Sequence, residues 1–312
     1  MIGLNDNKLY ATGLAFGAVA LASTQDAIVK SMSGVYPVYE TVIMRCIVAF
    51  PLLIGWLAFR NGVGQLATPH WRPVILRGLV LCSAYFAYVL ALASMPMANS
   101  VSIYFTMPLF VAAFSGWLLK EKVPLYRWLT IAFGFVGIWV MVRPNSASFQ
   151  PASLLALYSA FAYALGQMMG RSLSQKVDTL VIANWQNIIY LSVSVVLGLC
   201  VFVFGLTTES SKAMAFLTRQ AQWPNLNDAM VMIAMGVFST FAMMAYVNAY
   251  RLAPANFVAP FEYSAMIWAV LYGVFLFHDF PDQWTWIGAA LVVGAGLFMV
   301  WRDRIAQIQT TG

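Results

Sequence analysis

Ten stretches of about 20 mostly apolar residues constrain this chain more than any other feature of its sequence. Each is long enough to cross the hydrocarbon core of a bilayer as an α-helix. Only 9% of the residues are charged, against roughly 25% in a soluble domain, so most of the surface has to face lipid. A β-barrel would show shorter segments of alternating polarity, and we therefore predict an all-α integral membrane protein. The expected spans are Lys8–Met32, Tyr36–Phe59, Arg72–Met95, Ala98–Leu119, Leu125–Val142, Ala152–Leu173, Leu180–Leu206, Asp228–Arg251, Ala255–Phe277 and Gln283–Trp301.

Lysine and arginine are distributed unevenly over the ends of these spans. With the N-terminus inside, most of them fall at inner ends, and the outer ends hold only Lys30, Arg143, Lys212 and Arg219. Because cytoplasmic loops are enriched in Lys and Arg, we expect both termini in the cytoplasm. The net charge of +6 then reflects topology, and no nucleic-acid partner is expected. The longest connection, Thr207–Asn227, falls outside, either as a solvated loop or with a short surface helix.

The residue types that usually carry catalysis are sparse. His70 and His278 are expected at opposite faces of the membrane, and neither an HExxH pattern nor a nucleotide-binding motif occurs. Cys46, Cys82 and Cys200 lie in three different apolar runs without metal-ligand spacing. The sequence thus predicts no enzyme, no metal site and no cofactor.

An internal repeat divides the chain. A shift of 157 residues places Ala98–Val142 on Ala255–Met299, matching Ala-Asn with Ala-Asn, Pro with Pro and Gly with Gly. The predicted repeats cover residues 1–147 and 148–312 and contain five spans each. An odd number of spans inverts the second copy in the membrane. Inverted repeats are typical of carriers that work by alternating access.

Glycines in several spans predict close contact between helices, because the missing side chain lets two backbones approach. They are Gly13, Gly17, Gly134, Gly137, Gly288 and Gly294.

Short motifs in both halves carry a family resemblance. They are Tyr36-Pro37 followed by Arg45, Pro108-Leu109-Phe110, Leu119-Lys120-Glu121 and Leu252-Ala253-Pro254-Ala255-Asn256. With these motifs the chain resembles the EamA-type ten-helix members of the drug/metabolite transporter superfamily. The resemblance implies two inverted five-helix repeats around a central cavity, in the bacterial inner membrane. In one departure from the family, the counterpart of Glu121 in the second repeat is His278.

The resemblance also implies a function. The chain looks most like YddG-type amino-acid exporters, which indicates export of small metabolites by alternating access. Other members import S-adenosylmethionine-like compounds, so uptake or exchange is the alternative reading, and a lipid-handling protein is a further one. The expected partners are a small-molecule substrate and membrane lipid, with the chain acting as a monomer or homodimer.

Charged residues inside spans are costly and usually functional. Asp26 and Arg45 lie in the outer parts of spans one and two, which a short loop joins, so an ion pair between them is expected. The pair is either a structural lock or a gating or ion-coupling group. Glu262 follows Pro260 in span nine and is either paired with a donor such as Tyr or Asn, or is a candidate for substrate contact or ion coupling. Pro260 and Pro108, in equivalent spans, are hinge candidates because proline interrupts helical hydrogen bonding, with a packing feature as the alternative.

Aromatic and polar side chains recur at mid-span positions. Aromatic faces with a few polar tips are what a pocket for an amphipathic solute needs, although core packing is the alternative for each one. The candidates for the cavity are Tyr85, Tyr88, Tyr104, Tyr163, Gln167, Trp185, Tyr246, Glu262 and Tyr263.

Overall fold

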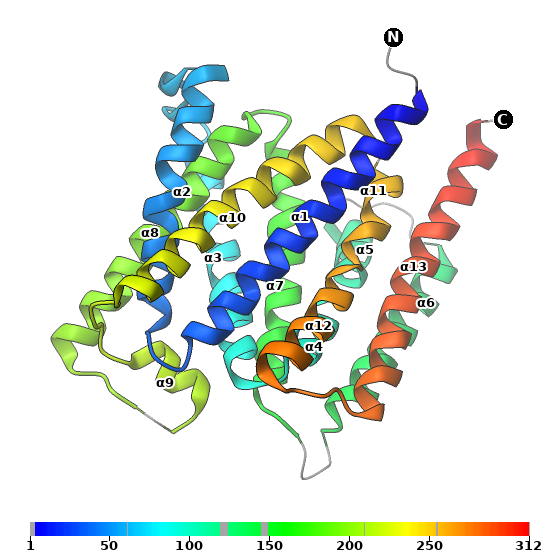
Figure 1. Cartoon of the computed structure of the whole chain (residues 1–312). Coiled ribbons are helices and arrows are strands. Elements are labelled where there is room, and N and C mark those ends of the chain that lie inside the picture. The colour runs from blue at the N-terminus through cyan, green and yellow to red at the C-terminus, as the bar shows by residue number, and fades with distance from the viewer. Residues whose placement is uncertain are drawn as a thin grey trace. The chain divides into compact units, whose positions relative to one another are not determined.

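The computed structural model describes residues 4–60, 62–118, 124–144, 149–208, 210–253 and 255–311. Within these ranges the chain is helical without strands, and ten segments are long and apolar enough to cross a membrane, which confirms the predicted class (Figure 1). The predicted repeat boundary at residues 147–148 and the Lys120-Glu121 motif lie outside the described residues. The helices are α1 Leu4–Met32, α2 Val38–Arg60, η1 Val63–Leu66, α3 Trp71–Ser94, α4 Met97–Tyr104, α5 Met107–Leu118, α6 Leu125–Val142, α7 Ala152–Leu173, α8 Thr179–Phe204, α9 Lys212–Thr218, α10 Leu226–Leu252, α11 Ala255–Glu262, α12 Ala265–Phe277 and α13 Gln283–Thr311.

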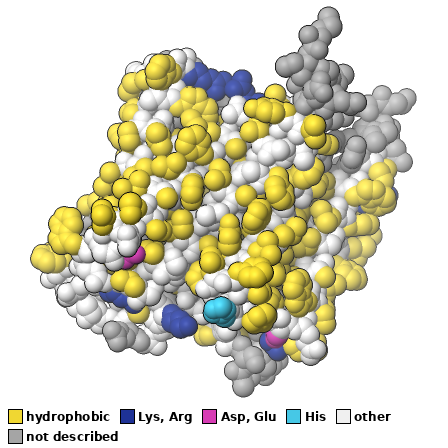
Figure 2. All heavy atoms as spheres, in the orientation of Figure 1, with side chains coloured by type: hydrophobic (Ala, Val, Ile, Leu, Met, Phe, Trp, Pro, Cys, Tyr) yellow, Lys and Arg dark blue, Asp and Glu magenta, His cyan; other side chains and the backbone are white. Residues whose placement is uncertain are grey.

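Large apolar side chains are exposed along these helices. Phe133 and Trp139 of α6 and Phe202 and Phe204 of α8 are each more than half exposed. Figure 2 shows one face on which hydrophobic side chains predominate and charged ones are few. A surface of this kind is stable against lipid and would be unusual for a soluble monomer.

The helices group into two compact units. Unit 1 comprises Met1–Thr24, Met95–Ser153 and Phe241–Gly312, and unit 2 comprises Gln25–Ser94 and Leu154–Thr240. Boundaries fall inside α1, α10 and the first turn of α7, so each of these helices contributes to both units. Each unit contains helices from both predicted repeats.

The predicted fourth span is not one continuous helix. It is broken between α4 and α5 at Phe105 and Thr106. The Thr106 N–H and hydroxyl both donate to the Ile103 carbonyl, at 3.0 and 2.7 Å. Pro108 follows at the start of α5, where it has no N–H to continue the ladder toward Tyr104. The hinge candidate therefore lies directly beside a break.

The ninth span is broken in the same manner between α11 and α12, at Tyr263 and Ser264. The Ser264 N–H and hydroxyl both donate to the Phe261 carbonyl, at 3.0 and 2.6 Å. The other hinge candidate, Pro260, lies inside α11. The two breaks meet within unit 1, where the Phe105 and Tyr263 rings are 4.9 Å apart between centroids.

Glycines bring α6 and α13 together in unit 1, where the two helices lie side by side (Figure 1). A Cβ on Gly137 would lie 2.9 Å from the Gly288 carbonyl oxygen, and one on Gly288 would lie 2.6 Å from the Gly137 oxygen. Gly134 makes room for Leu109 in the same way. The prediction of close contact is wrong for the other three, since no described atom lies within 4 Å of a Cβ built on Gly13, Gly17 or Gly294.

In unit 2, α2 packs along α8. Two buried asparagines of α8 reach across, with Asn184 donating to the Leu53 carbonyl at 3.3 Å and Asn187 to the Cys46 carbonyl at 3.1 Å. Polar side chains that bond between spans stabilise helix pairs in lipid. The α2–α8 pair forms the scaffold on which the polar residues of unit 2 are carried.

The long connection between α8 and α10 contains a short helix, which decides between the two predicted alternatives. Ser211 caps α9 by accepting from the Met214 N–H at 3.2 Å, and Phe216 is fully buried. Arg219, just after α9, donates to the Ser33 carbonyl at 2.9 Å and accepts from the Tyr39 hydroxyl at its own carbonyl. The segment is thus tied to the α1–α2 turn within unit 2.

Candidate functional site

Arg45 is the centre of a buried polar cluster in unit 2. It extends from α2, is 8% exposed, and lies over two tyrosine rings, 4.3 Å from the Tyr85 centroid and 5.2 Å from the Tyr190 centroid. The two rings are themselves 5.5 Å apart. Cation–π contacts of this kind stabilise a guanidinium when water is excluded. They leave its positive charge without a neutralising carboxylate in the part of the chain that the structure describes.

Asp26 has a different partner from the one predicted. The carboxylate of Asp26 accepts a hydrogen bond of 2.7 Å from the Tyr88 hydroxyl, and no ion pair joins it to Arg45 among the described residues. Tyr88 lies one turn beyond Tyr85 on α3, so one helix face supplies the partners of both charges. Asp26 and Arg45 thus each contact a different tyrosine of α3, Tyr88 and Tyr85.

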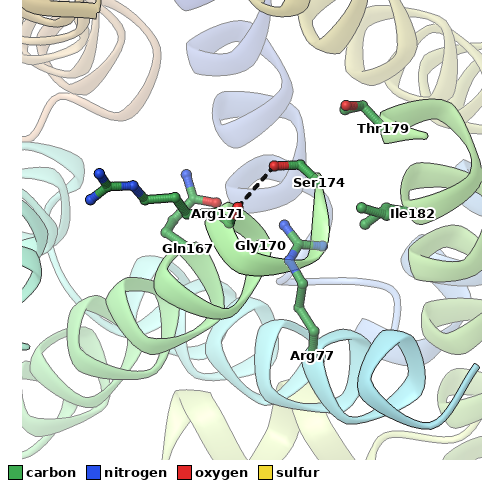
Figure 3. A pocket seen from close by; sticks show the side chains of 7 residues that line it. All are labelled: Arg77, Gln167, Gly170, Arg171, Ser174, Thr179 and Ile182. Carbon is green, nitrogen blue, oxygen red and sulfur yellow. Dashed lines mark hydrogen bonds between the residues drawn. The ribbon is translucent and has the colours of Figure 1, made fainter. Parts of the chain in front are cut away.

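The cluster continues toward the other end of unit 2. The Tyr190 hydroxyl donates to the Leu81 carbonyl at 2.8 Å and accepts from the Gln186 amide at 3.4 Å. The Gln186 oxygen accepts from Arg77 at 3.1 Å. Arg77 lines a cavity of about 220 Å³ together with the predicted residue Gln167 (Figure 3).

Glu262 and Tyr263, two adjacent residues predicted for the site, lie in unit 1. Glu262 accepts a hydrogen bond from the Tyr250 hydroxyl of α10. Tyr263 packs on Phe105 at the helix breaks, and its buried hydroxyl has no hydrogen-bond partner among the described atoms. The position of that hydroxyl depends on Gly296, where a Cβ would collide with it.

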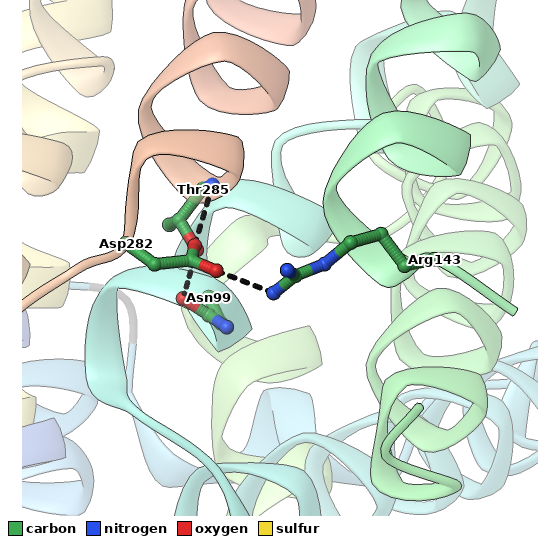
Figure 4. Close-up of polar contacts among 4 residues, drawn as sticks. All are labelled: Asn99, Arg143, Asp282 and Thr285. Atoms are coloured by element: carbon green, nitrogen blue, oxygen red, sulfur yellow. Dashed lines mark hydrogen bonds and ion pairs between the residues drawn. The ribbon is translucent and has the colours of Figure 1, made fainter. Parts of the chain in front are cut away.

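A second polar group in unit 1 joins three helix ends around a cavity of about 170 Å³ (Figure 4). Arg143 pairs with Asp282, and the Thr285 hydroxyl bonds both Asp282 and Asn99, at 2.6 and 3.0 Å. Burial acts to raise the pKa of Asp282, but the hydrogen bonds from Thr285 and the charge of Arg143 outweigh it and hold that pKa below the usual 3.8. Asp282 therefore remains ionised at neutral pH.

A model of a known protein family matches both halves of the chain. The EamA-like transporter family matches residues 9–143 and again residues 150–301. The chain belongs to the EamA-like transporter family. It is a multi-pass membrane protein and a secondary transporter of small metabolites, not an enzyme.

Curated relatives of this EamA-like transporter cover nearly its whole length. The S-adenosylmethionine uptake transporter of Rickettsia prowazekii is 23% identical over 299 residues, 95% of each chain. The riboflavin transporter of Brucella anthropi is 25% identical over 289 residues, 93% of this chain and 95% of that one. A riboflavin transporter of Vibrio cholerae is 26% identical over 94% of this chain and 91% of its own length. The names of these relatives do not support the predicted likeness to YddG-type amino-acid exporters in particular.

The same fold occurs in a solved crystal structure with a TM-score of 0.63. It is 22% identical to this transporter, and the match covers 95% of this chain and 98% of the other. At this identity the likeness extends to the fold alone.

The remaining predicted cavity residues are carried by helices of both units. The indole of Trp185 donates to the Leu66 carbonyl of η1 at 3.0 Å and packs against the core at that end of unit 2. Tyr163 is half-buried on α7, whereas Tyr104 on α4 and Tyr246 on α10 are half-buried in unit 1.

Sequence reasoning missed two residues of unit 2. Tyr190 was not singled out, although it lies one turn after Gln186 on α8. Arg77 was counted only as an inner-end charge, although it sits six residues inside α3 and faces a cavity. The available signal was the same as for Arg45, since both are cations within a predicted span.

Proposed function

We propose that this transporter takes up or exchanges a small metabolite that combines a flat ring with charged groups, in the manner of an S-adenosylmethionine-like compound. The observation that carries the proposal is Arg45 against Tyr85 and Tyr190, with Asp26 on the same side of unit 2. Two aromatic faces suit a ring, a guanidinium suits a carboxylate, and a carboxylate suits a cationic centre. The names of the relatives, S-adenosylmethionine and riboflavin transporters, support a ring-bearing substrate.

The contacts of Arg45 and Asp26 within the protein can be replaced by contacts with a charged substrate. Arg45 is held by ring faces and Asp26 by one tyrosine hydroxyl, so each contact is weaker than a direct ion pair would be. A substrate with a carboxylate and a cation can replace these contacts without separating two opposite charges inside the membrane. Removing one charge-assisted hydrogen bond costs about 1.5–3 kcal/mol, which corresponds to roughly 10- to 150-fold in affinity.

We propose alternating access as the mechanism. Two inverted repeats, residues 1–147 and 148–312, supply it, and the paired breaks beside Pro108 and Pro260 are its hinge candidates. We infer from the distribution of Lys and Arg that the chain lies in a bacterial inner membrane with both termini on the cytoplasmic side. Ion or proton coupling, with Asp26 or Glu262 as the titrating group, would make transport concentrative; substrate exchange needs no such group.

Amino-acid export is the second candidate. Arg45 and Asp26 together also suit the carboxylate and ammonium groups of a free amino acid. Uptake of a ring-bearing metabolite requires a nucleoside or flavin ring in the substrate, whereas amino-acid export does not. The two functions also differ in the direction of transport.

Flux into proteoliposomes tests the proposal. Purified transporter is reconstituted, and uptake of radiolabelled S-adenosylmethionine, riboflavin and aromatic amino acids is compared with protein-free vesicles and with preloaded vesicles. We expect saturable flux of S-adenosylmethionine or riboflavin that falls at least tenfold in Arg45→Gln. The control is Arg72→Gln, because Arg72 is an exposed arginine of α3. Flux of amino acids alone would favour export, and equal flux in both variants would remove Arg45 from the site.

A further inference from the structure

Arg77 is a half-buried cation of unit 2 and has no role in the site proposed above. It lies within the third span, and its protein partners are neutral. No carboxylate contacts it in the parts of the chain that the structure describes. A charge at such a position usually faces a partner charge or a water-filled cavity.

The guanidinium of Arg77 is held in a built cradle. Its Nε donates to the Gly166 carbonyl and its Nη1 to the Gln186 oxygen, both at 3.1 Å. A Cβ on Gly170 would lie 2.8 Å from Nε and 3.2 Å from Nη2, so the group lies against α7 where this glycine leaves room. These contacts occupy two of the five N–H groups of arginine. The others are left to the cavity that Arg77 lines.

The opposite wall of this cavity comes from α7 and α8. Figure 3 shows Arg77 reaching from α3 toward the turn of α7 that carries Gly170 and Ser174, with Thr179 and Ile182 across from it. Arg171 of α7 also lines this space (Figure 3). Asp178 is the acidic residue next to the cavity residue Thr179 in the sequence. Its carboxylate caps α8 by accepting from the Leu180 N–H at 2.7 Å.

The space is larger than a single ion requires. Its volume is about 220 Å³, which is several times the roughly 30 Å³ that one water molecule occupies in the liquid. It can hold a tetrahedral oxyanion together with part of the group that bears it.

We propose that the Arg77 cavity binds a phosphate group, carried either by a free phosphate-bearing solute or by the headgroup of an anionic phospholipid. The remaining fork of guanidinium N–H groups matches two phosphate oxygens, and the Thr179 hydroxyl faces the same space. Basic pockets between spans on the cytoplasmic side are sites where anionic headgroups bind. The site is separate from Arg45 but is joined to it through Gln186 and Tyr190.

The solute arm of the test uses inorganic phosphate on delipidated transporter in a neutral detergent. Phosphate is titrated against chloride at equal ionic strength while thermal unfolding is followed. Ser174→Asp places a carboxylate on the cavity rim next to Arg77 without removing the arginine. Ser172→Asp is the matched control, because Ser172 is exposed on the same turn and does not line the cavity. We expect the phosphate affinity to fall at least tenfold in Ser174→Asp and in Arg77→Gln, and to persist in Ser172→Asp.

The lipid arm uses nanodiscs of phosphatidylglycerol or phosphatidylcholine. Stabilisation by phosphatidylglycerol that is lost in Ser174→Asp and kept in Ser172→Asp, without an effect of free phosphate, assigns the cavity to a headgroup. Stabilisation by inorganic phosphate with the same pattern assigns it to a solute. If neither probe stabilises the wild type, or if both variants respond alike, the proposal is overturned. Because the readout is binding, a failure here leaves the transport proposal untouched.

Discussion

Replacing Gly288 by alanine should separate α6 from α13. The new Cβ would lie 2.6 Å from the Gly137 carbonyl oxygen and 2.7 Å from the Met141 Cβ. Carbon atoms in favourable contact are about 3.5–4.0 Å apart, so the helices have to move apart by about 1 Å at this turn. Neither neighbour is the end of a flexible side chain. Overpacking of this kind costs typically about 1–3 kcal/mol.

The matched control is Gly294→Ala on the same helix. No described atom lies within 4 Å of a Cβ built there, and the glycine is exposed. Alanine favours the helix over glycine by roughly 0.5–1 kcal/mol at both positions. This gain cancels in the comparison, so the difference between the two variants isolates the strain. We therefore expect Gly288→Ala to be about 1–3 kcal/mol less stable than Gly294→Ala.

Equilibrium unfolding in detergent micelles measures this difference. Both variants are purified at equal lipid content, and their unfolding midpoints are compared with the wild type in the absence of substrate. If Gly288→Ala is as stable as Gly294→Ala, the close packing of α6 on α13 is not what stabilises unit 1.

Three other perturbations test separate parts of the chain. Tyr88→Phe removes the hydroxyl that bonds Asp26, and the loss of a hydrogen bond to a charged group should destabilise the protein by about 1.5–3 kcal/mol; unchanged thermal unfolding would contradict this. The contacts of Asp282 hold its pKa below 3.8. The stability that they contribute is therefore complete above pH 3.8 and is lost as the pH falls through the pKa of Asp282 in the folded protein. The difference in unfolding free energy between wild type and Asp282→Asn should shrink in acid, and a difference that does not change with pH would refute this prediction. Phe216→Ala empties a fully buried site in α9 and should cost about 3–5 kcal/mol in unfolding free energy; a smaller effect would show that α9 is not packed on unit 2.

Much of the fold could be predicted because hydrophobic length is a local property. The ten spans follow from runs of about 20 apolar residues, and the structure confirms ten candidate segments. The common face of Tyr85 and Tyr88 is equally local, since residues three apart on a helix lie on one side. Arg45 and Asp26 stood out because each is a charge within an apolar run.

Local patterns do not determine which side chains from different helices meet, because that depends on the rotation and depth of each helix. Asp26 therefore contacts Tyr88 and not Arg45, and Arg45 lies on Tyr190, which no spacing indicated. Gly137 and Gly288 face another backbone, whereas Gly294 on the same helix as Gly288 does not. The amino-acid sequence by itself determined the ten spans and the charged positions within them. Only the tertiary structure decided the partners of those charges, since hydrophobic periodicity places a residue on a face but does not say what that face touches.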